Sequence, residues 1–291
     1  MLQSLKVWLL RHYYRWSGAR AWRGNFTDAP YSTLQLPLPG RSLAARLYSS
    51  PAGRDLPLVI YFHGGGWVIG DLESHHAFCQ QLREQGGCTV VAVDYRLAPE
   101  HPCPAALDDC REATRWLVQN LESSGPNNGS IVVAGDSAGG HLAVCTALTL
   151  DPEARARLVG ALLIYPVVDH YSTPYASYVE RAKGQTLTSD LMRWFWDTWL
   201  AGEGAEAATA AGAVPMHSTG LATLPPCLLV TAERDPLRDE GVQFAEQLRA
   251  AGITVTSEHY GNAEHGFACS QGPTPDCKHF MTLARGWLRT L

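Results

Sequence analysis

The residues best suited to covalent chemistry lie in one glycine-rich stretch, residues 135–140 (GDSAGG), with Ser137 inside it. An apolar, strand-like run (SIVVA) precedes this stretch, and a helix-like sequence follows it. A serine held in a sharp turn between a buried strand and a helix presents its hydroxyl at the top of a sheet, where it can attack a carbonyl carbon. Gly135 and Gly139 fit this turn because a Cβ atom at either position would collide with neighbouring backbone. The pattern predicts a serine nucleophile.

A second glycine-rich turn, residues 63–67 (HGGGW), could stabilise the negative charge that such an attack creates. It follows another strand-like run (LVIYF), and its glycines leave backbone N–H groups free to point at one place. We expect the N–H groups of Gly65, Gly66 and Ala138 to bind this oxyanion, with Gly64 shaping the turn. The alternative is an ordinary tight turn between a strand and a helix.

A serine nucleophile also needs a general base, and a histidine is the usual one. In sites of this kind the chain order is serine, acid, histidine, so the base should lie late in the sequence. His265 lies in a predicted loop that follows the strand-like residues 253–256. His259 is expected within a strand and His279 within the last helix. We therefore interpret His265 as the base.

The acid that orients the base should follow the preceding strand, residues 227–231. Asp235 lies in the loop after this strand, just before a predicted helix. Glu233 lies closer to the strand end, and Asp239 is expected to be helical already. We choose Asp235, which could also cap the helix that follows it.

These motifs together resemble those of the hormone-sensitive-lipase-like family of α/β-hydrolases, in its bacterial esterase branch. The matching segments, in the family's order, are HGGG at 63–66, DYRLAPEHP at 94–102, GDSAGG at 135–140, DPLRD at 235–239 and HGF at 265–267. The aspartate before the serine indicates the GDSAGG subgroup. The resemblance implies hydrolysis of small-molecule carboxylic esters with short acyl chains, without a cofactor or a metal ion.

Three alternatives stay open beside the short-chain esterase. The same triad could cleave amides or lactams, and a true lipase would act on long-chain triglycerides. A small-molecule receptor on a hydrolase scaffold belongs to another class of function. Such receptors typically lose the base, whereas Ser137, Asp235 and His265 are all present here.

Composition excludes several classes of protein. With 291 residues, 46% hydrophobic and 18% charged, the chain can bury a large core and is not disordered. A net charge of −5 argues against nucleic acid as a partner. The eight cysteines form no Cys-x-x-Cys pair, which argues against a zinc site and suggests reduced thiols in the cytoplasm. Cys269 and Cys277 could pair in an oxidising compartment.

The spacing of apolar runs predicts one α/β domain over residues 1–291, with a mostly parallel sheet and helices on both faces. Residues 33–38 and 43–48 alternate in polarity and predict an antiparallel pair at the sheet edge. Further strands are expected near 58–62, 89–93, 131–134, 158–164, 227–231 and 253–256, with helices near 74–85, 104–121, 138–150, 239–251 and 276–290. We expect residues 94–102 to be scaffold, with Asp94, Arg96 and Glu100 paired beneath the catalytic loops.

Two segments outside this alternation are expected to form a helical cap, residues 1–30 and 166–225. The second contains an aromatic helix, residues 189–200, of which at least one bulky side chain should limit the pocket. The pocket is expected to be lined by Trp67, Asp136, Leu187, Trp194, Phe195 and Trp199.

The N-terminal segment is basic and apolar. Its apolar residues Leu2, Leu5, Leu9, Tyr13 and Trp16 recur at helical spacing, and no acid occurs before Asp28. We favour packing of this apolar stripe on the hydrolase body over contact with an anionic membrane surface. The apolar run is too short for a secretory signal or a spanning helix. The sequence leaves a homodimer open.

Overall fold

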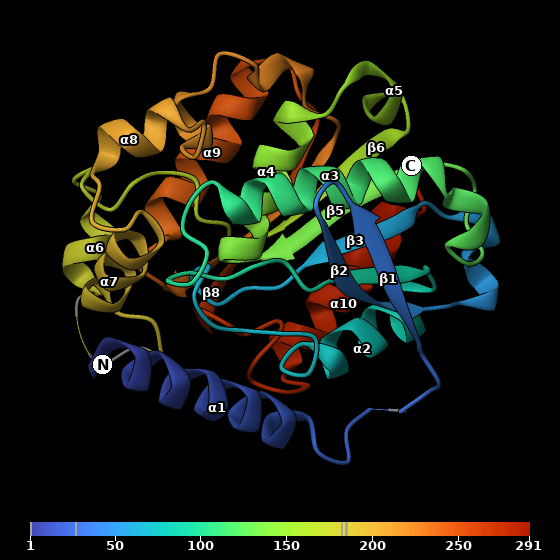
Figure 1. Cartoon of the computed structure of the whole chain (residues 1–291), viewed down its shortest axis with the longest axis horizontal. Helices are drawn as coiled ribbons and strands as arrows, with labels where there is room; N and C mark the ends of the chain where they lie inside the picture. Colours follow the sequence, from blue (N-terminus) through green and yellow to red (C-terminus); the bar gives the residue numbers. More distant parts are fainter. Residues whose placement is uncertain (1, 27, 182, 184–185) are drawn as a thin grey trace.

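The fold is built on one eight-stranded sheet (Figure 1). The computed structural model describes residues 2–26, 28–181, 183 and 186–291. The strand order is β1-β2-β4-β3-β5-β6-β7-β8, with β1, β2 and β4 paired antiparallel and the other neighbours parallel. The strands are β1 (Ser32–Leu38), β2 (Arg41–Tyr48), β3 (Leu58–Phe62), β4 (Val90–Val93), β5 (Ile131–Asp136), β6 (Leu158–Ile164), β7 (Cys227–Arg234) and β8 (Val255–Glu264).

The central strands are apolar throughout because helices cover both faces of the sheet. On one face Ile60 and Phe62 pack with α3 (Ala105–Gln119), α4 (Ala138–Thr149) and α9 (Arg238–Ala250). On the other face Val59 and Tyr61 pack with α2 (His76–Gly86) and α10 (Pro275–Leu288). This arrangement confirms the predicted fold class, including the antiparallel pair at the edge.

The remaining helices lie outside these two layers. They are α1 (Leu2–Trp22), α5 (Pro152–Arg155), α6 (Ala176–Glu180), α7 (Ser189–Trp199) and α8 (Ala205–Ala210), with short 3-10 helices at Pro51–Asp55, Leu121–Ser123, Pro215–His217 and Leu221–Thr223. In Figure 1 the N-terminal end of α1 lies beside α7. None of the helices in the described residues is both long enough and apolar enough to cross a bilayer.

The orientation of α1 differs from the prediction. Leu5, Leu9 and Trp16 face solvent instead of packing on the body, and Tyr13 is mostly exposed but borders the pocket described below. The side chain of Leu2 lies outside the described residues. Val7 and Trp22 are buried instead. The helix rotates this way because Arg11 and other polar groups on its inner side form hydrogen bonds with the body.

Two strands extend further than predicted. β7 continues to Arg234, and β8 continues through His259 to Glu264. The two strands stay paired up to Arg234 and Glu264, across an irregularity in the register. His265 therefore follows directly after a strand, not after a long loop, and its backbone is held by the sheet.

Candidate active site

Ser137 stands in a strained turn between the end of β5 and the start of α4. Its φ and ψ are 55° and −120°, a conformation that non-glycine residues seldom adopt. The turn is tight: a Cβ at Gly135 would lie 2.3 Å from the Gly139 carbonyl, and one at Gly139 would lie 2.0 Å from the Phe62 carbonyl oxygen. The flanking glycines therefore let three backbone segments meet beneath the serine.

The side chains of Ser137, His265 and Asp235 form a chain of hydrogen bonds. Ser137 Oγ lies 3.0 Å from His265 Nε2, and His265 Nδ1 lies 2.7 Å from Asp235 Oδ2. Asp235 is completely buried and its second oxygen accepts a hydrogen bond from the Leu237 N–H at 2.9 Å. This is the geometry by which a carboxylate orients an imidazole that can take a proton from a serine hydroxyl.

Neighbouring groups fix the imidazole in place. The ring of Tyr165 lies 4.6 Å from the ring of His265, centre to centre. The Gln271 side chain donates a hydrogen bond to the His265 carbonyl oxygen at 3.2 Å. His259, the histidine expected within a strand, does lie in β8, and its Nε2 is 3.1 Å from Glu233, not near Ser137.

The glycine-rich turn after β3, here called the oxyanion loop (residues 63–67), has an unusual backbone. Gly65, Gly66 and Trp67 all have positive φ, at 122°, 57° and 60°. In the described part of the chain, the N–H groups of Gly65 and Gly66 donate to no backbone or side-chain acceptor. Ala138 is the first residue of α4, where N–H groups lack partners within the helix. Free donors thus surround the space beside Ser137.

Asp136 holds the oxyanion loop from behind. Its Oδ1 accepts hydrogen bonds from the Gly64 N–H at 2.8 Å and from the Tyr61 hydroxyl at 2.5 Å. His75 Nε2 lies 3.3 Å from the same oxygen. Burial opposes ionisation, but the charge of His75 and the donated hydrogen bonds outweigh burial and lower the pKa of the Asp136 carboxyl. A buried carboxylate therefore anchors the loop.

His63 begins the oxyanion loop and is a structural residue. Its Nδ1 donates to the Gly64 carbonyl oxygen at 2.8 Å, and its ring stacks on Tyr95 at 4.3 Å. Burial, reinforced by the nearby His75, lowers the pKa of His63 to about 4. The imidazole is therefore neutral near pH 7, and its single N–H fixes the loop backbone.

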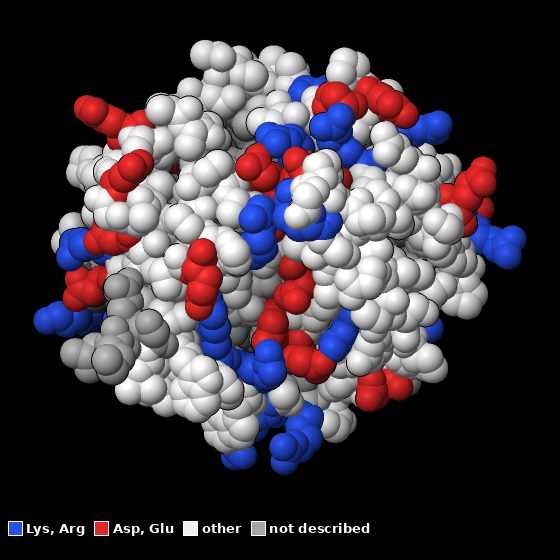
Figure 2. All heavy atoms as spheres, viewed as in Figure 1, with Lys and Arg blue, Asp and Glu red and all other residues white. Residues whose placement is uncertain are grey.

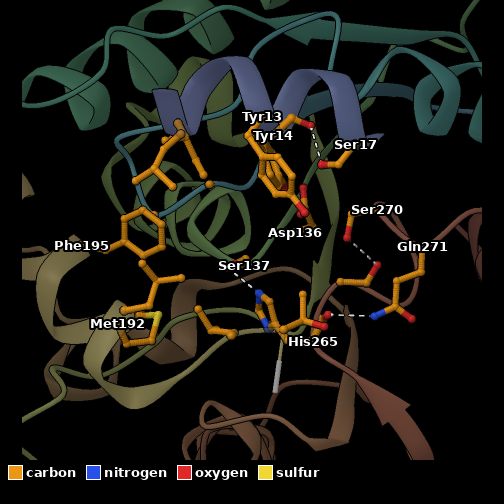
Figure 3. A pocket seen from close by; sticks show the side chains of 18 residues that line it. Tyr13, Tyr14, Ser17, Asp136, Ser137, Met192, Phe195, His265, Ser270 and Gln271 are labelled. Atoms are coloured by element: carbon orange, nitrogen blue, oxygen red, sulfur yellow. Dashed lines mark hydrogen bonds between the residues drawn. The ribbon is translucent and has the colours of Figure 1, made fainter. Parts of the chain in front are cut away.

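A cavity of about 310 Å³ opens above Ser137 (Figure 3). Three of the six predicted pocket residues line it, Asp136, Leu187 and Phe195. The helix α1 contributes four further residues, of which only Tyr13 belongs to the apolar stripe found in the sequence. Periodicity placed an apolar stripe on α1 but did not show which face meets the body. The residues that complete the wall, beside Ser137, His265 and the oxyanion loop, are Leu10, Tyr13, Tyr14 and Ser17 from α1, Ile69, Leu191 and Met192, and Thr186, Gly266, Ser270 and Gln271.

The other three predicted pocket residues, Trp67, Trp194 and Trp199, do not line the cavity. Trp67 and Trp199 are fully buried and stack on each other at 4.3 Å. His141 of α4 completes this cluster and accepts a hydrogen bond from Trp67 Nε1 at 3.2 Å. Trp194 is partly buried against the core, and its ring lies under the ammonium of Lys6 at 4.2 Å. The indoles therefore fasten α7 to the body, while Phe195 faces the cavity.

The expected network of Asp94, Arg96 and Glu100 does not form. Arg96 pairs instead with the buried Asp109 of α3 at 2.9 Å. Glu100 pairs with Arg11 of α1 at 2.7 Å. The segment 94–102 is thus tied to two different helices, because Arg96 and Glu100 find their partners outside the segment.

The cysteines, all within the described residues, form no disulfide beside this site. All eight cysteines are free, including Cys269 and Cys277. Within the described residues, no three His, Cys, Asp or Glu side chains are placed so that they could hold a metal ion.

Comparison with known proteins places these features in a family. A family model described as the alpha/beta hydrolase fold matches residues 59–269. Esterase LipI of Mycobacterium tuberculosis is 38% identical over 240 residues, which cover 81% of this chain and 74% of that protein. Ethyl acetate hydrolase of Pseudomonas putida is 36% identical over 241 residues, covering 78% and 72%. A hyperthermophilic esterase from the archaeon Pyrobaculum calidifontis has a TM-score of 0.89 at 35% identity, covering 98% and 93%. The chain belongs to the hormone-sensitive-lipase-like family of α/β-hydrolases.

Proposed function

We propose that this carboxylic ester hydrolase acts on short-chain acyl esters through an acyl-enzyme formed on Ser137. The observation that carries the proposal is the sequence of contacts from Ser137 Oγ to His265 Nε2 at 3.0 Å and from His265 Nδ1 to Asp235 at 2.7 Å, at the floor of the cavity. The esterases among the relatives, one of them named for ethyl acetate, support the same reaction class.

The mechanism follows from these contacts. His265 takes the hydroxyl proton as Ser137 Oγ attacks the ester carbonyl, and Asp235 stabilises the imidazolium that forms. The N–H groups of Gly65, Gly66 and Ala138 bind the oxyanion of the tetrahedral intermediate. His265 then protonates the departing alcohol oxygen, which leaves the acyl group on Ser137. Water, deprotonated by His265, attacks this second ester and releases the acid.

The walls of the cavity support small, neutral substrates. About 310 Å³ is at the small end of the range for ligand pockets. Leucine, methionine and phenylalanine side chains from the loop before α7 and from α7 itself form an apolar wall opposite α1. Among the described lining residues only Asp136 and His265 are acidic or basic: the Asp136 carboxylate is bonded to Gly64 and Tyr61, and the His265 ring is bonded to Ser137. A charged acyl chain would find no partner in this wall.

The eight free cysteines support a reducing compartment. We therefore place the enzyme in the cytoplasm, where small-molecule esters are its partners.

The test is hydrolysis of p-nitrophenyl esters from acetyl to palmitoyl, with Ser137→Ala as the blank. We expect the highest kcat/KM between acetyl and hexanoyl, and no turnover above background by the variant. A serine-reactive phosphonate should add its mass to the native chain and not to Ser137→Ala. Activity that survives the substitution would overturn the role of Ser137, and a preference for palmitoyl would overturn the short-chain assignment.

A further inference from the structure

The helix α1 has two apolar faces, of which only one is used in the fold. Its inner face contributes Val7 and Trp22 to the core, and Leu10 and Tyr14 to the pocket. Its outer face presents large apolar side chains to solvent, each about half exposed or more: Leu5 (55%), Trp8 (53%), Leu9 (54%), Tyr13 (64%) and Trp16 (54%). An exposed apolar patch of this kind marks a surface that contacts another phase or molecule.

The exposure is a property of the fold because polar contacts fix the rotation of the helix. Arg11 donates to the carbonyl oxygens of Val68 at 2.9 Å and Ala98 at 3.0 Å. Trp22 Nε1 donates to the Cys269 carbonyl oxygen at 2.7 Å. Turning the outer face inward would break these buried bonds and would place Arg11 in solvent.

The charged side chains of α1 itself are all basic. Lys6, Arg11, Arg15, Arg20 and Arg23 precede the first acid of the chain. Arg11 and Arg15 are paired with acids of the body, whereas Lys6 and Arg20 lie over indole rings next to the exposed patch. In Figure 2, which shares the view of Figure 1, blue basic atoms gather at the lower edge, where α1 lies. This local excess stands against a net charge of −5 for the whole chain.

We propose that the outer face of α1, the face formed by Leu5, Trp8, Leu9, Tyr13 and Trp16, docks on an anionic lipid bilayer. Tryptophan, tyrosine and leucine side chains enter the boundary between headgroups and acyl chains, and the basic side chains contact the phosphates. A second copy of the chain fits the face less well, since pairing two such faces would bring their like charges together.

Docking also orients the active site toward the bilayer. Tyr13 belongs both to the outer face and to the wall of the cavity above Ser137. The mouth of the pocket therefore lies at the edge of the docked surface. Docking does not depend on which ester is hydrolysed, so it can be tested without an activity assay.

The experiment is co-sedimentation of the full chain with vesicles of phosphatidylglycerol and phosphatidylcholine, against vesicles of phosphatidylcholine alone. We expect binding to the anionic vesicles, weakened by added salt. The double variant Trp8→Ser/Trp16→Ser should lower the partition coefficient at least about tenfold, since both indoles lose an apolar environment. Lys6→Gln/Arg20→Gln should lower it by about 25-fold, because each cation near an anionic surface contributes about fivefold.

Two matched controls separate the patch from general surface effects. Val242→Ser removes an exposed apolar side chain on α9. Arg285→Gln/Arg289→Gln removes two charges at the end of α10. Both should bind as the native chain does, and thermal unfolding should show all variants folded. The proposal is overturned if the native chain does not bind anionic vesicles, or if the tryptophan variant binds equally well. It is also overturned if light scattering shows a dimer that the tryptophan variant dissociates, because a second copy would then cover the face.

Discussion

Replacing Asp136 by alanine tests whether a buried carboxylate behind the oxyanion loop supports catalysis without touching the substrate carbonyl. Its Oδ1 accepts from the Gly64 N–H and from the Tyr61 hydroxyl, and His75 lies 3.3 Å away. Alanine removes the acceptor and leaves these groups facing an apolar methyl. The loop that carries Gly65 and Gly66 then loses its attachment to β5.

The expected magnitude has two parts. Each buried donor left without a partner costs about 1–3 kcal/mol, so loss of the two hydrogen bonds should lower the free energy of unfolding by about 2–6 kcal/mol. Displacing one oxyanion donor costs about 3 kcal/mol in the transition state, which lowers kcat by about two orders of magnitude. The KM should change little, because these donors act mainly on the charge that develops during attack. Asp136→Asn keeps an oxygen that can accept from Gly64, and its kcat should stay within about tenfold of the native value.

The assay is the kinetics of p-nitrophenyl butyrate hydrolysis, measured below the melting temperature of each variant. Asp109→Ala is the matched control, because Asp109 is also fully buried and hydrogen-bonded but belongs to α3. It should lower stability and leave kcat of the folded enzyme unchanged. If Asp136→Ala lowers kcat no more than Asp109→Ala does, the loop does not depend on this carboxylate. An equal loss in the asparagine and alanine variants would show that the charge matters and the hydrogen bond to Gly64 does not.

Three further outcomes are expected. Gly66→Ala should lower kcat about a hundredfold or more, because the new Cβ would lie 2.2 Å from the Phe195 ring at a φ of 57°; unchanged kinetics would contradict the close approach. Phe195→Ala should shift the preferred acyl chain to longer esters, whereas Trp194→Ala, one residue away but outside the cavity, should leave the chain-length profile unchanged. Burial lowers the pKa of His141 to about 4 from its ordinary 6.5, so the unfolded chain binds the proton first as the pH falls. The stability that neutral His141 contributes is present above pH 6.5 and decreases by about 3 kcal/mol toward pH 4. In chemical unfolding, the His141→Gln variant should therefore lose less stability than the native chain between pH 6.5 and pH 4. An equal loss in both proteins would refute a neutral, buried His141 as its cause.

Sequence reasoning succeeded where the physical cause is local. The buried strands appear as apolar runs because helices cover both faces of the sheet. Gly135 and Gly139 are required by contacts within a few residues of Ser137 and across one strand. The order of serine, acid and histidine follows from the ends of successive parallel strands, so Asp235 and His265 could be chosen by position alone.

Sequence reasoning failed where the position of a residue depends on tertiary contacts. Nothing near His75 in the sequence indicates that its ring lies against Asp136, because the two are brought together only when α2 packs on the sheet. Trp67 and Trp199 are predicted to line the pocket, but they are buried away from it and stack on each other. The prediction of which face of α1 packs on the body is wrong because the helix is apolar on two sides. The hydrogen bonds of Arg11 determine which of the two sides faces the body.

These tertiary contacts meet at the oxyanion loop. Asp136 holds the loop from below through the Gly64 N–H, and Phe195 of α7 closes against Gly66 from the pocket side. Arg11 of α1 binds the carbonyl oxygen of Val68, the residue that follows the loop directly. The helices α1, proposed to contact a bilayer, and α7, which limits the pocket, therefore both contact the backbone of the oxyanion loop or of the residue after it. The elements that form the walls of the substrate pocket therefore also position the N–H donors that stabilise the transition state. A substitution that moves α1 or α7 is expected to change both substrate binding and catalysis.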